Sequence, residues 1–166
     1  TYCLGEIVHN KQVVLDLEEK GIKFIENIEQ VKEKDSKVII RAHGVEKNIY
    51  EIAKTKNIEL IDYTCPNVLK IHKIAEQYKK QGYYIFLTGT ENHPEVIGIL
   101  SHCGINVSLI TTEEDIQKAI QDFKNSNKKK LLVISQTTYS IKKFENVKNI
   151  IEETIPKETE LVIKNT

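Results

Sequence analysis

An internal repeat constrains the fold of this 166-residue chain more than any other feature. The segment E-I-V-H-N (6–10), followed by a helical pattern and by G-I-K-F-I (21–25), returns later in the chain. The second copy is T-E-N-H-P (90–94), again followed by a helical pattern and then by G-I-N-V-S-L-I (104–110). Strands that alternate with helices in two copies predict an α/β protein with two tandem, similar small domains, each with a parallel sheet flanked by helices.

Apolar patterns place the individual elements. The continuous apolar runs Val38–Ile40 and Leu131–Ile134 are typical of strands covered on both faces. Pro66 is expected to open a helix directly after Cys65, and Thr112 to cap another. The other expected strands are 2–4, 23–25, 59–62, 83–87, 107–110 and 160–163, and the other expected helices include a weak one over 29–34, one over 46–56 and one over 140–154.

The repeat also suggests domain boundaries. We expect a first domain over 1–65 that lacks its opening segment, and a second domain over 66–158. The segment 159–166 is then a closing strand that leads to a further domain. The chain begins at Thr1 and contains no methionine, so we expect it to be a piece of a longer protein.

Composition excludes several classes of partner. Lys plus Arg and Asp plus Glu balance at 24 each, so no net charge favours binding to nucleic acid or to an anionic membrane. The sequence contains no apolar run long enough to cross a bilayer and no signal peptide. Three widely spaced cysteines with no C-x-x-C pair argue against a disulfide framework and a structural zinc site. A cytoplasmic protein is expected.

The residues with functional chemistry follow the predicted strands. In parallel α/β sheets, ligands bind outside the carboxyl ends of the strands, so such residues can converge on one cavity. Imidazoles, amides and hydroxyls suit a polyanion such as a diphosphate, whereas a carboxylate is suited to proton transfer. A thiol before a helix N-terminus is stabilised as a thiolate, which makes it a candidate ligand or nucleophile. The set comprises His9, His43, Cys65, His93, Glu95, Gln136 and Thr137.

Each of these residues also has a purely structural explanation. His9 and His93 could cap the helices that they precede, and Glu95 could only complement a helix dipole. His43 could be a turn residue, and Gln136 and Thr137 could make hydrogen bonds at a helix entry. Cys65 could be a small buried residue at a domain join. We place His72 outside the site as a solvated or interdomain residue, and we expect Cys3 and Cys103 to be buried in the core.

Five ordered motifs together are more specific than any one of them. They are E-I-V-H-N (6–10), R-A-H-G-V (41–45), D-Y-T-C-P-N-V (62–68), N-H-P-E-V-I-G (92–98) and S-Q-T-T (135–138). In this order and at these separations the chain resembles the 4-hydroxy-3-methylbut-2-enyl diphosphate reductase family. The resemblance runs along the whole chain. It implies an iron–sulfur oxidoreductase of three related α/β domains in a trefoil-like arrangement, which performs the last step of the methylerythritol phosphate route to isoprenoids.

The resemblance also implies residue roles. By motif, Cys65 would be one of three cysteine ligands of a [4Fe–4S] cluster, with the other two outside this sequence. Glu95 and Thr137 would be catalytic, with Glu95 supplying protons and Thr137 relaying them. An electron donor such as ferredoxin or flavodoxin would deliver two electrons, and isopentenyl and dimethylallyl diphosphates would form. The allylic diphosphate would be held by His9, His43, His93, Gln136 and Thr137.

Two alternatives stay open. With one ligand cysteine of three, the chain by itself is expected to be inactive, which leaves room for a catalytically silent α/β scaffold module. The second alternative is a zinc-dependent hydrolase that uses His9, His43, His93 and Cys65, although no local pair of ligands supports it.

Overall fold

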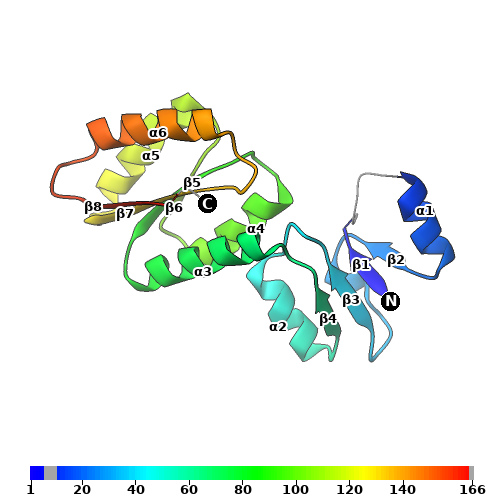
Figure 1. Cartoon of the computed structure of the whole chain (residues 1–166). Helices are drawn as coiled ribbons and strands as arrows, with labels where there is room; N and C mark the ends of the chain where they lie inside the picture. Colours follow the sequence, from blue (N-terminus) through cyan, green and yellow to red (C-terminus); the bar gives the residue numbers. More distant parts are fainter. Residues whose placement is uncertain (6–10, 165–166) are drawn as a thin grey trace. The chain divides into compact units, whose positions relative to one another are not determined.

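The computed structural model describes residues 1–5 and 11–164, which form two units, Thr1–Pro66 and Asn67–Thr166. Each unit carries one four-stranded sheet in which the paired strands are parallel (Figure 1). The α/β fold class and the tandem repeat are confirmed. The segment 159–166, set apart above as a closing strand, contains β8 (Glu160–Lys164), which pairs with β7 (Lys130–Ser135) inside the second unit.

The first unit has the strand order β2-β1-β3-β4. Its core gathers apolar side chains from these strands and from the loops and helices that cover them, among them Leu4, Ile28, Val38, Ile40 and Ala53. In chain order its elements are β1 (Tyr2–Leu4), α1 (Lys11–Glu19), β2 (Lys23–Ile25), the 3-10 helix η1 (Ile28–Gln30), β3 (Lys37–Ile40), α2 (Lys47–Thr55) and β4 (Glu59–Asp62).

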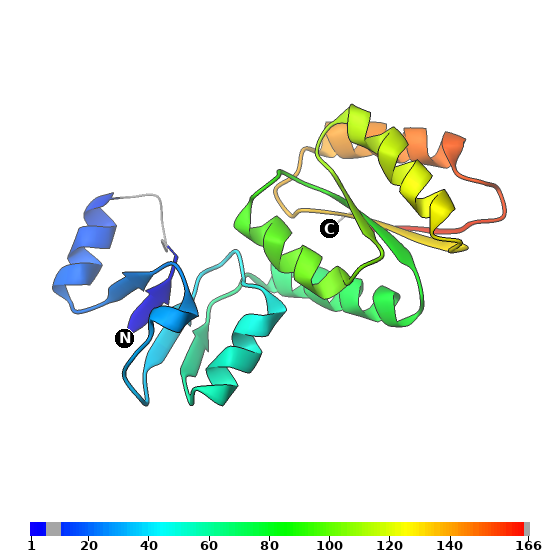
Figure 2. The same ribbon diagram turned by 180° about the vertical axis from the view of Figure 1, so that it is seen from behind.

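The second unit has the corresponding order β6-β5-β7-β8. Helices cover both faces of its sheet, with α5 and α6 on one face and α3 and α4 on the other (Figures 1 and 2). Side chains of β5 alternate between these faces, as the pleat requires. Its further elements are α3 (Pro66–Lys80), β5 (Tyr84–Thr88), α4 (Pro94–Cys103), β6 (Val107–Ile110), α5 (Glu113–Asn125) and α6 (Ile141–Thr154).

The repeat extends to matching contacts. At the entry of the third and fourth strands, Lys37 pairs with Glu59 in the first unit and Lys130 with Glu160 in the second, each with an N···O distance of 3.1 Å. The glycine that follows the first strand donates its N–H to the end of the second strand in both units. The acceptors are the carbonyls of Ile25, for Gly5, and Ile110, for Gly89.

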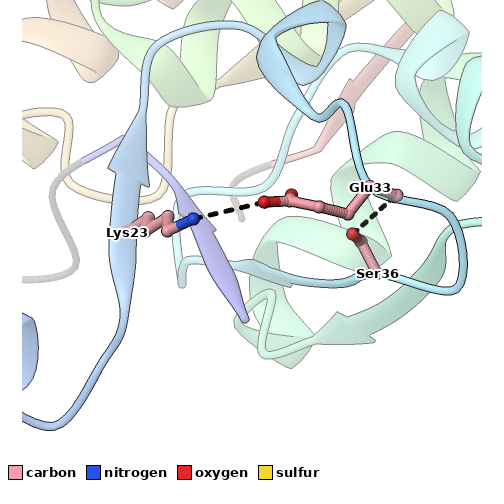
Figure 3. A network of polar contacts seen from close by, with 3 residues as sticks. All are labelled: Lys23, Glu33 and Ser36. Carbon is pink, nitrogen blue, oxygen red and sulfur yellow. Dashed lines mark hydrogen bonds and ion pairs between the residues drawn. The ribbon is translucent and has the colours of Figure 1, made fainter.

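The helix expected over 29–34 is wrong: only the 3-10 turn η1 forms. Asn27 and Gln30 close a capping box around this turn, and residues 32–35 are all exposed and charged. A helix continued through them would have no apolar face to bury. The segment is instead held by Ser36 Oγ, which donates to the Glu33 carbonyl at 2.7 Å, and by the Lys23–Glu33 ion pair at 3.2 Å (Figure 3).

His72 was expected to be solvated or interdomain, and the solvated alternative is wrong. The side chain is 4% exposed and lies inside the second unit, where its ring stacks on His102 with centroids 4.3 Å apart. The expected burial of Cys3 and Cys103 is confirmed, since each is 1% exposed. Along α1, by contrast, no residue is fully buried, and Val13 and Leu15 remain exposed.

The Asp115 carboxylate stabilises the N-terminus of α5 by hydrogen bonds. It accepts hydrogen bonds from the backbone N–H groups of Thr111 and Thr112, each at 2.9 Å, and from both threonine hydroxyls. The hydroxyl bond from Thr111, followed by the backbone bonds, lowers the pKa of Asp115 to about 2. Asp115→Ala is therefore expected to lower the free energy of unfolding at neutral pH by about 1 kcal/mol, the usual value of a lost cap.

The difference in the free energy of unfolding between Asp115→Ala and the unmodified protein should depend on pH, and this dependence identifies the carboxylate as its source. The unfolded-state pKa of Asp is about 3.9, so its contribution is complete above that value and is lost as the pH falls through the folded pKa of about 2. Urea unfolding of both proteins between pH 7 and pH 3 should show the difference narrowing with acid. Glu114→Ala, which removes the exposed preceding carboxylate, is the control. A difference independent of pH would contradict this role.

Candidate functional site

The described candidate residues follow the central strands β3, β5 and β7 and, for Cys65, the edge strand β4. In the second unit β5 lies between β6 and β7, so the chain leaves β5 and β7 toward opposite sides of the sheet. Such a switch point opens a crevice beyond the carboxyl ends of the strands, where ligands of parallel α/β proteins bind. The loop after β5 delivers His93 and Glu95, and the loop after β7 delivers Gln136 and Thr137.

Glu95 and Thr137 are in direct contact. The Thr137 N–H donates to Glu95 Oε1 at 2.7 Å, and the Thr137 hydroxyl donates to Glu95 Oε2 at 2.9 Å. Glu95 is only 1% exposed, although it stands in the first turn of α4. A buried carboxylate is stable only when its oxygens are hydrogen-bonded, and both oxygens are. This is more than a surface charge that complements a helix dipole: the carboxyl is fixed beside a hydroxyl.

His93 caps α4. Its Nδ1 accepts the backbone N–H of Glu95 at 3.2 Å, so the capping interpretation of this residue is realised. With Nδ1 as an acceptor, the neutral imidazole carries its hydrogen on Nε2. The cap orients the ring, with Nε2 as the nitrogen that bears the hydrogen. The same backbone bond ties the ring to Glu95.

Gln136 is 3% exposed and makes its contacts within the chain. Its Oε1 accepts the Thr90 N–H at 3.0 Å, and its Nε2 donates to Thr138 Oγ1 at 2.9 Å. The amide therefore joins the loop after β5 to the loop after β7. These bonds agree with the hydrogen bonding at a helix entry that the sequence also suggested.

In the first unit, the loops after β3 and β4 bring Cys65 next to the segment that carries His43. The Cys65 N–H donates to the Ala42 carbonyl at 2.9 Å, and Gly44 closes a turn by donating to Arg41 at 3.0 Å. Both Cys65 and His43 are half-buried. Cys65 directly precedes Pro66, the first residue of α3, as predicted.

Asp62 fixes the turn that precedes Cys65, a role that was not predicted from the sequence. One carboxylate oxygen accepts from the backbone N–H and the hydroxyl of Thr64, and the other accepts from Tyr50 OH at 2.8 Å. Burial, with the bond to Asp62, raises the pKa of Tyr50 to about 12. The D-x-T spacing is the signal that could have revealed this turn, because Asp side chains bind the backbone two residues on.

The other two cysteines differ chemically from Cys65. Burial raises the pKa of Cys103 to about 12 and also raises the pKa of Cys3 above its ordinary value. Their thiols donate to the carbonyls of Ile99 and Gly5 within the cores. Neutral core thiols are poor ligands and nucleophiles. Of the three, Cys65 is the one placed for chemistry.

Each unit carries its own group of candidate residues. In the first unit the Cys65 backbone is bonded to Ala42, the residue before His43. In the second unit, hydrogen bonds connect His93 to Glu95 and Glu95 to Thr137, and Gln136 directly precedes Thr137. The convergence of all of them on one cavity stays a prediction. His9 lies outside the described residues. Thr90 and Thr138, the partners of Gln136, were not singled out from the sequence.

Within residues 1–5 and 11–164, no group of three or more His, Cys, Asp or Glu side chains could hold a metal ion. The zinc-hydrolase hypothesis, which also invokes His9, therefore finds no support in this part of the chain. Among the described helices, none is both long and apolar enough to cross a bilayer.

The fold and these residues define an α/β protein of repeated parallel units. One sheet carries an acid–hydroxyl pair and a helix-capping imidazole beyond its strand ends, and the other sheet carries a thiol. The sequence matches the family described as LytB protein over residues 1–166, and the chain belongs to this family.

The relatives that this chain resembles are reductases. It is 42% identical over 166 residues to the 4-hydroxy-3-methylbut-2-enyl diphosphate reductase of Caldanaerobacter subterraneus subsp. tengcongensis, which covers 99% of this chain and 54% of the relative. The enzyme of the same name from Clostridioides difficile is 38% identical and is covered to 56%. The chain thus spans about half the length of the curated relatives it matches.

Solved structures agree with the fold. A structure of (E)-4-hydroxy-3-methyl-but-2-enyl diphosphate reductase, the terminal enzyme of the non-mevalonate pathway, superimposes with a TM-score of 0.82 at 32% identity. That match covers 99% of this chain and 56% of the other. The corresponding reductase from Plasmodium falciparum also gives 0.82, at 33% identity, and is covered to 49%.

Proposed function

We propose that this chain is part of an iron–sulfur reductase that converts 4-hydroxy-3-methylbut-2-enyl diphosphate to isopentenyl and dimethylallyl diphosphates. The buried Glu95–Thr137 pair is the observation that carries the proposal. It places a carboxyl and a hydroxyl in contact at the switch point of a parallel sheet, and Glu95 stands two residues beyond the imidazole that caps α4. An acid held this way is equipped to move a proton.

The reaction needs two electrons and two protons. One proton leaves with the substrate hydroxyl as water, and the other is added to the allylic carbon skeleton. Glu95 is the proton source and Thr137 its relay, since the hydroxyl is hydrogen-bonded to the carboxylate. The diphosphate is held by the imidazoles His43 and His93, with His9, Gln136 and Thr137 in the same proposed binding set. A ferredoxin or flavodoxin would donate the electrons.

A [4Fe–4S] cluster, when bound, supplies electrons and a Lewis-acidic iron. Cys65 is the proposed ligand from this chain. The described residues offer that single edge thiol, because Cys3 and Cys103 are core residues with raised pKa values. One thiolate does not retain a four-iron cluster, so the described residues by themselves do not fit the cofactor.

The test is anaerobic assay of the whole protein with a chemical reductant and 4-hydroxy-3-methylbut-2-enyl diphosphate. We expect both C5 diphosphates and one water per two electrons consumed. A scaffold module would form neither product. Iron and sulfide analysis of the 166-residue chain beside the whole protein separates the two further: a full cluster and turnover in the chain alone would contradict its expected inactivity.

His93 is expected to bind substrate as well as cap α4. In the whole protein, His93→Ala should raise the KM for the diphosphate by about 10- to 100-fold, the value of a hydrogen bond to a charged group. It should also destabilise the helix by about 1 kcal/mol, because the cap is lost. Steady-state kinetics and urea unfolding measure the two effects.

The variant His93→Asn separates the effect on substrate binding from the effect on helix stability. An asparagine oxygen can accept the Glu95 N–H and restore the cap, but it lacks the imidazole Nε2–H. We expect near-normal stability with the raised KM. Normal KM in this variant would show that His93 serves the helix alone.

A further inference from the structure

The amide of Gln136 spans the two loops that deliver the catalytic pair. On one side, Oε1 holds the Thr90 N–H at the start of the loop that leads to His93 and Glu95. On the other side, Nε2 holds the Thr138 hydroxyl, one residue beyond Thr137. Removing this amide would release both loops at once.

The backbone of Gln136 is fixed as firmly as its side chain. Its N–H donates to the Thr88 carbonyl at 2.8 Å, and its carbonyl accepts the Tyr139 N–H at 3.0 Å. Thr137 therefore lies between two anchored neighbours, and its own N–H and hydroxyl are directed at Glu95. The geometry of the Glu95–Thr137 pair depends on where Gln136 holds this loop.

The side chain packs over a glycine, which explains its close approach. A Cβ built on Gly89 would lie 3.2 Å from Gln136 Oε1 and 2.6 Å from Val96 Cγ2. The first unit repeats this arrangement: Arg41, the first residue after β3, covers Gly5, where an added Cβ would lie 2.7 Å from Cζ. In both units the residue after the third strand is packed onto the glycine after the first strand, which indicates a structural device of the repeat.

We propose that Gln136 is a positioning residue, which sets the Glu95–Thr137 geometry through Thr90 and Thr138 and does not bind the substrate directly. This removes Gln136 from the proposed diphosphate-binding set, which then comprises His9, His43, His93 and Thr137. The positioning of the pair stands on the contacts within the second unit, whereas its effect on turnover rests on the proposed function.

The kinetic test replaces Gln136 by methionine, which has a similar length and no hydrogen-bonding amide. In the whole protein, Gln136→Met should lower kcat by about 10- to 100-fold, as misplaced catalytic groups do. The KM for the allylic diphosphate should change less than about threefold, because uniform binding is kept. A raised KM with unchanged kcat would make Gln136 a substrate contact and overturn the proposal.

A double-mutant cycle tests the route of action. Thr137→Val removes the hydroxyl that Gln136 is proposed to position. In that background, Gln136→Met should lower kcat by no more than about twofold, because residues that act through one another are not additive. Two independent, multiplying losses would contradict positioning through Thr137.

Amide hydrogen exchange supplies a readout that does not require turnover. In the 166-residue chain, Gln136→Met should accelerate hydrogen exchange of the Thr90 and Thr137 backbone amides. The control Gln121→Met removes an exposed side-chain hydrogen bond on α5 and should leave exchange at both amides unchanged. Unchanged exchange at Thr137 would overturn the positioning role even if the protein is an active reductase. Accelerated exchange in a protein without reductase activity would instead remove only the proposed function.

A milder variant covers the case in which methionine prevents folding. Thr138→Val keeps the shape of an exposed side chain and removes one partner of the Gln136 amide. We expect faster exchange at Thr137 and a kcat lowered by about 2- to 10-fold, the range for one hydrogen bond. Exchange and kcat both equal to those of the unmodified protein would contradict the inference.

Discussion

Glu95→Gln should abolish proton delivery while the fold survives. Glutamine is isosteric: its oxygen can still accept the Thr137 N–H, and its NH2 group can donate to the Thr137 hydroxyl oxygen. What disappears is the acidic carboxyl group that can donate a proton. We expect kcat of the whole protein to fall by about 10²- to 10⁴-fold, the usual contribution of a general acid. The loss of charge-assisted bonding should cost only about 1–2 kcal/mol of unfolding free energy.

The matched control for this variant is Glu153→Gln. Glu153 is exposed near the C-terminal end of α6, and the same chemical change there should leave kcat unaltered. Turnover of Glu95→Gln at the unmodified rate would remove Glu95 from the proton pathway. If the variant failed to fold, the carboxylate would have a structural role larger than these contacts indicate.

Phe86→Ala should produce the largest loss of stability. The ring is fully buried in β5 and packs edge-on against Tyr84 and Phe123, with centroids 5.8 and 6.3 Å apart. Removing a fully buried ring leaves a cavity that the surrounding strands and helices only partly fill, at a cost of about 3–5 kcal/mol. Because the chain has two units, exchange of β5 and β7 amides is a better measure than one global transition.

Ile105→Ala serves as its control. Ile105 is 95% exposed, so the substitution removes an apolar side chain without opening a cavity and should change stability by less than about 0.5 kcal/mol. A loss of similar size in both variants would mean that exchange does not report on the core of the second unit. A small loss for Phe86→Ala alone would contradict the packing described for this ring.

The two units divide the proposed chemistry. The second unit supplies the acid Glu95, its hydroxyl partner Thr137 and the helix-capping His93, all connected by hydrogen bonds. The first supplies the thiol of Cys65 next to the turn that carries His43. The residues directly after the equivalent third strands differ, since Arg41 follows β3 and Gln136 follows β7.

Local pattern was sufficient to predict most elements and several of their ends. The α3 helix begins at Pro66 and Thr112 is the N-cap of α5, both as expected. It failed over 29–34, where strong helix-forming residues have no apolar face. It also misjudged His72, because spacing along one helix cannot reveal that a second helix covers a polar side chain.

The sequence by itself determined the kind and order of the elements, the repeat and the residue types at the strand ends, because periodicity, caps and breakers act over a few neighbouring residues. Only the tertiary structure decided that β5 pairs with β7 and that Glu95 meets Thr137, 42 residues further along the chain. It also decided that the Gln136 side chain joins the loop after β5 to the loop after β7 by hydrogen bonds. Such contacts depend on which strands become neighbours, and that choice is made by the packing of the whole unit.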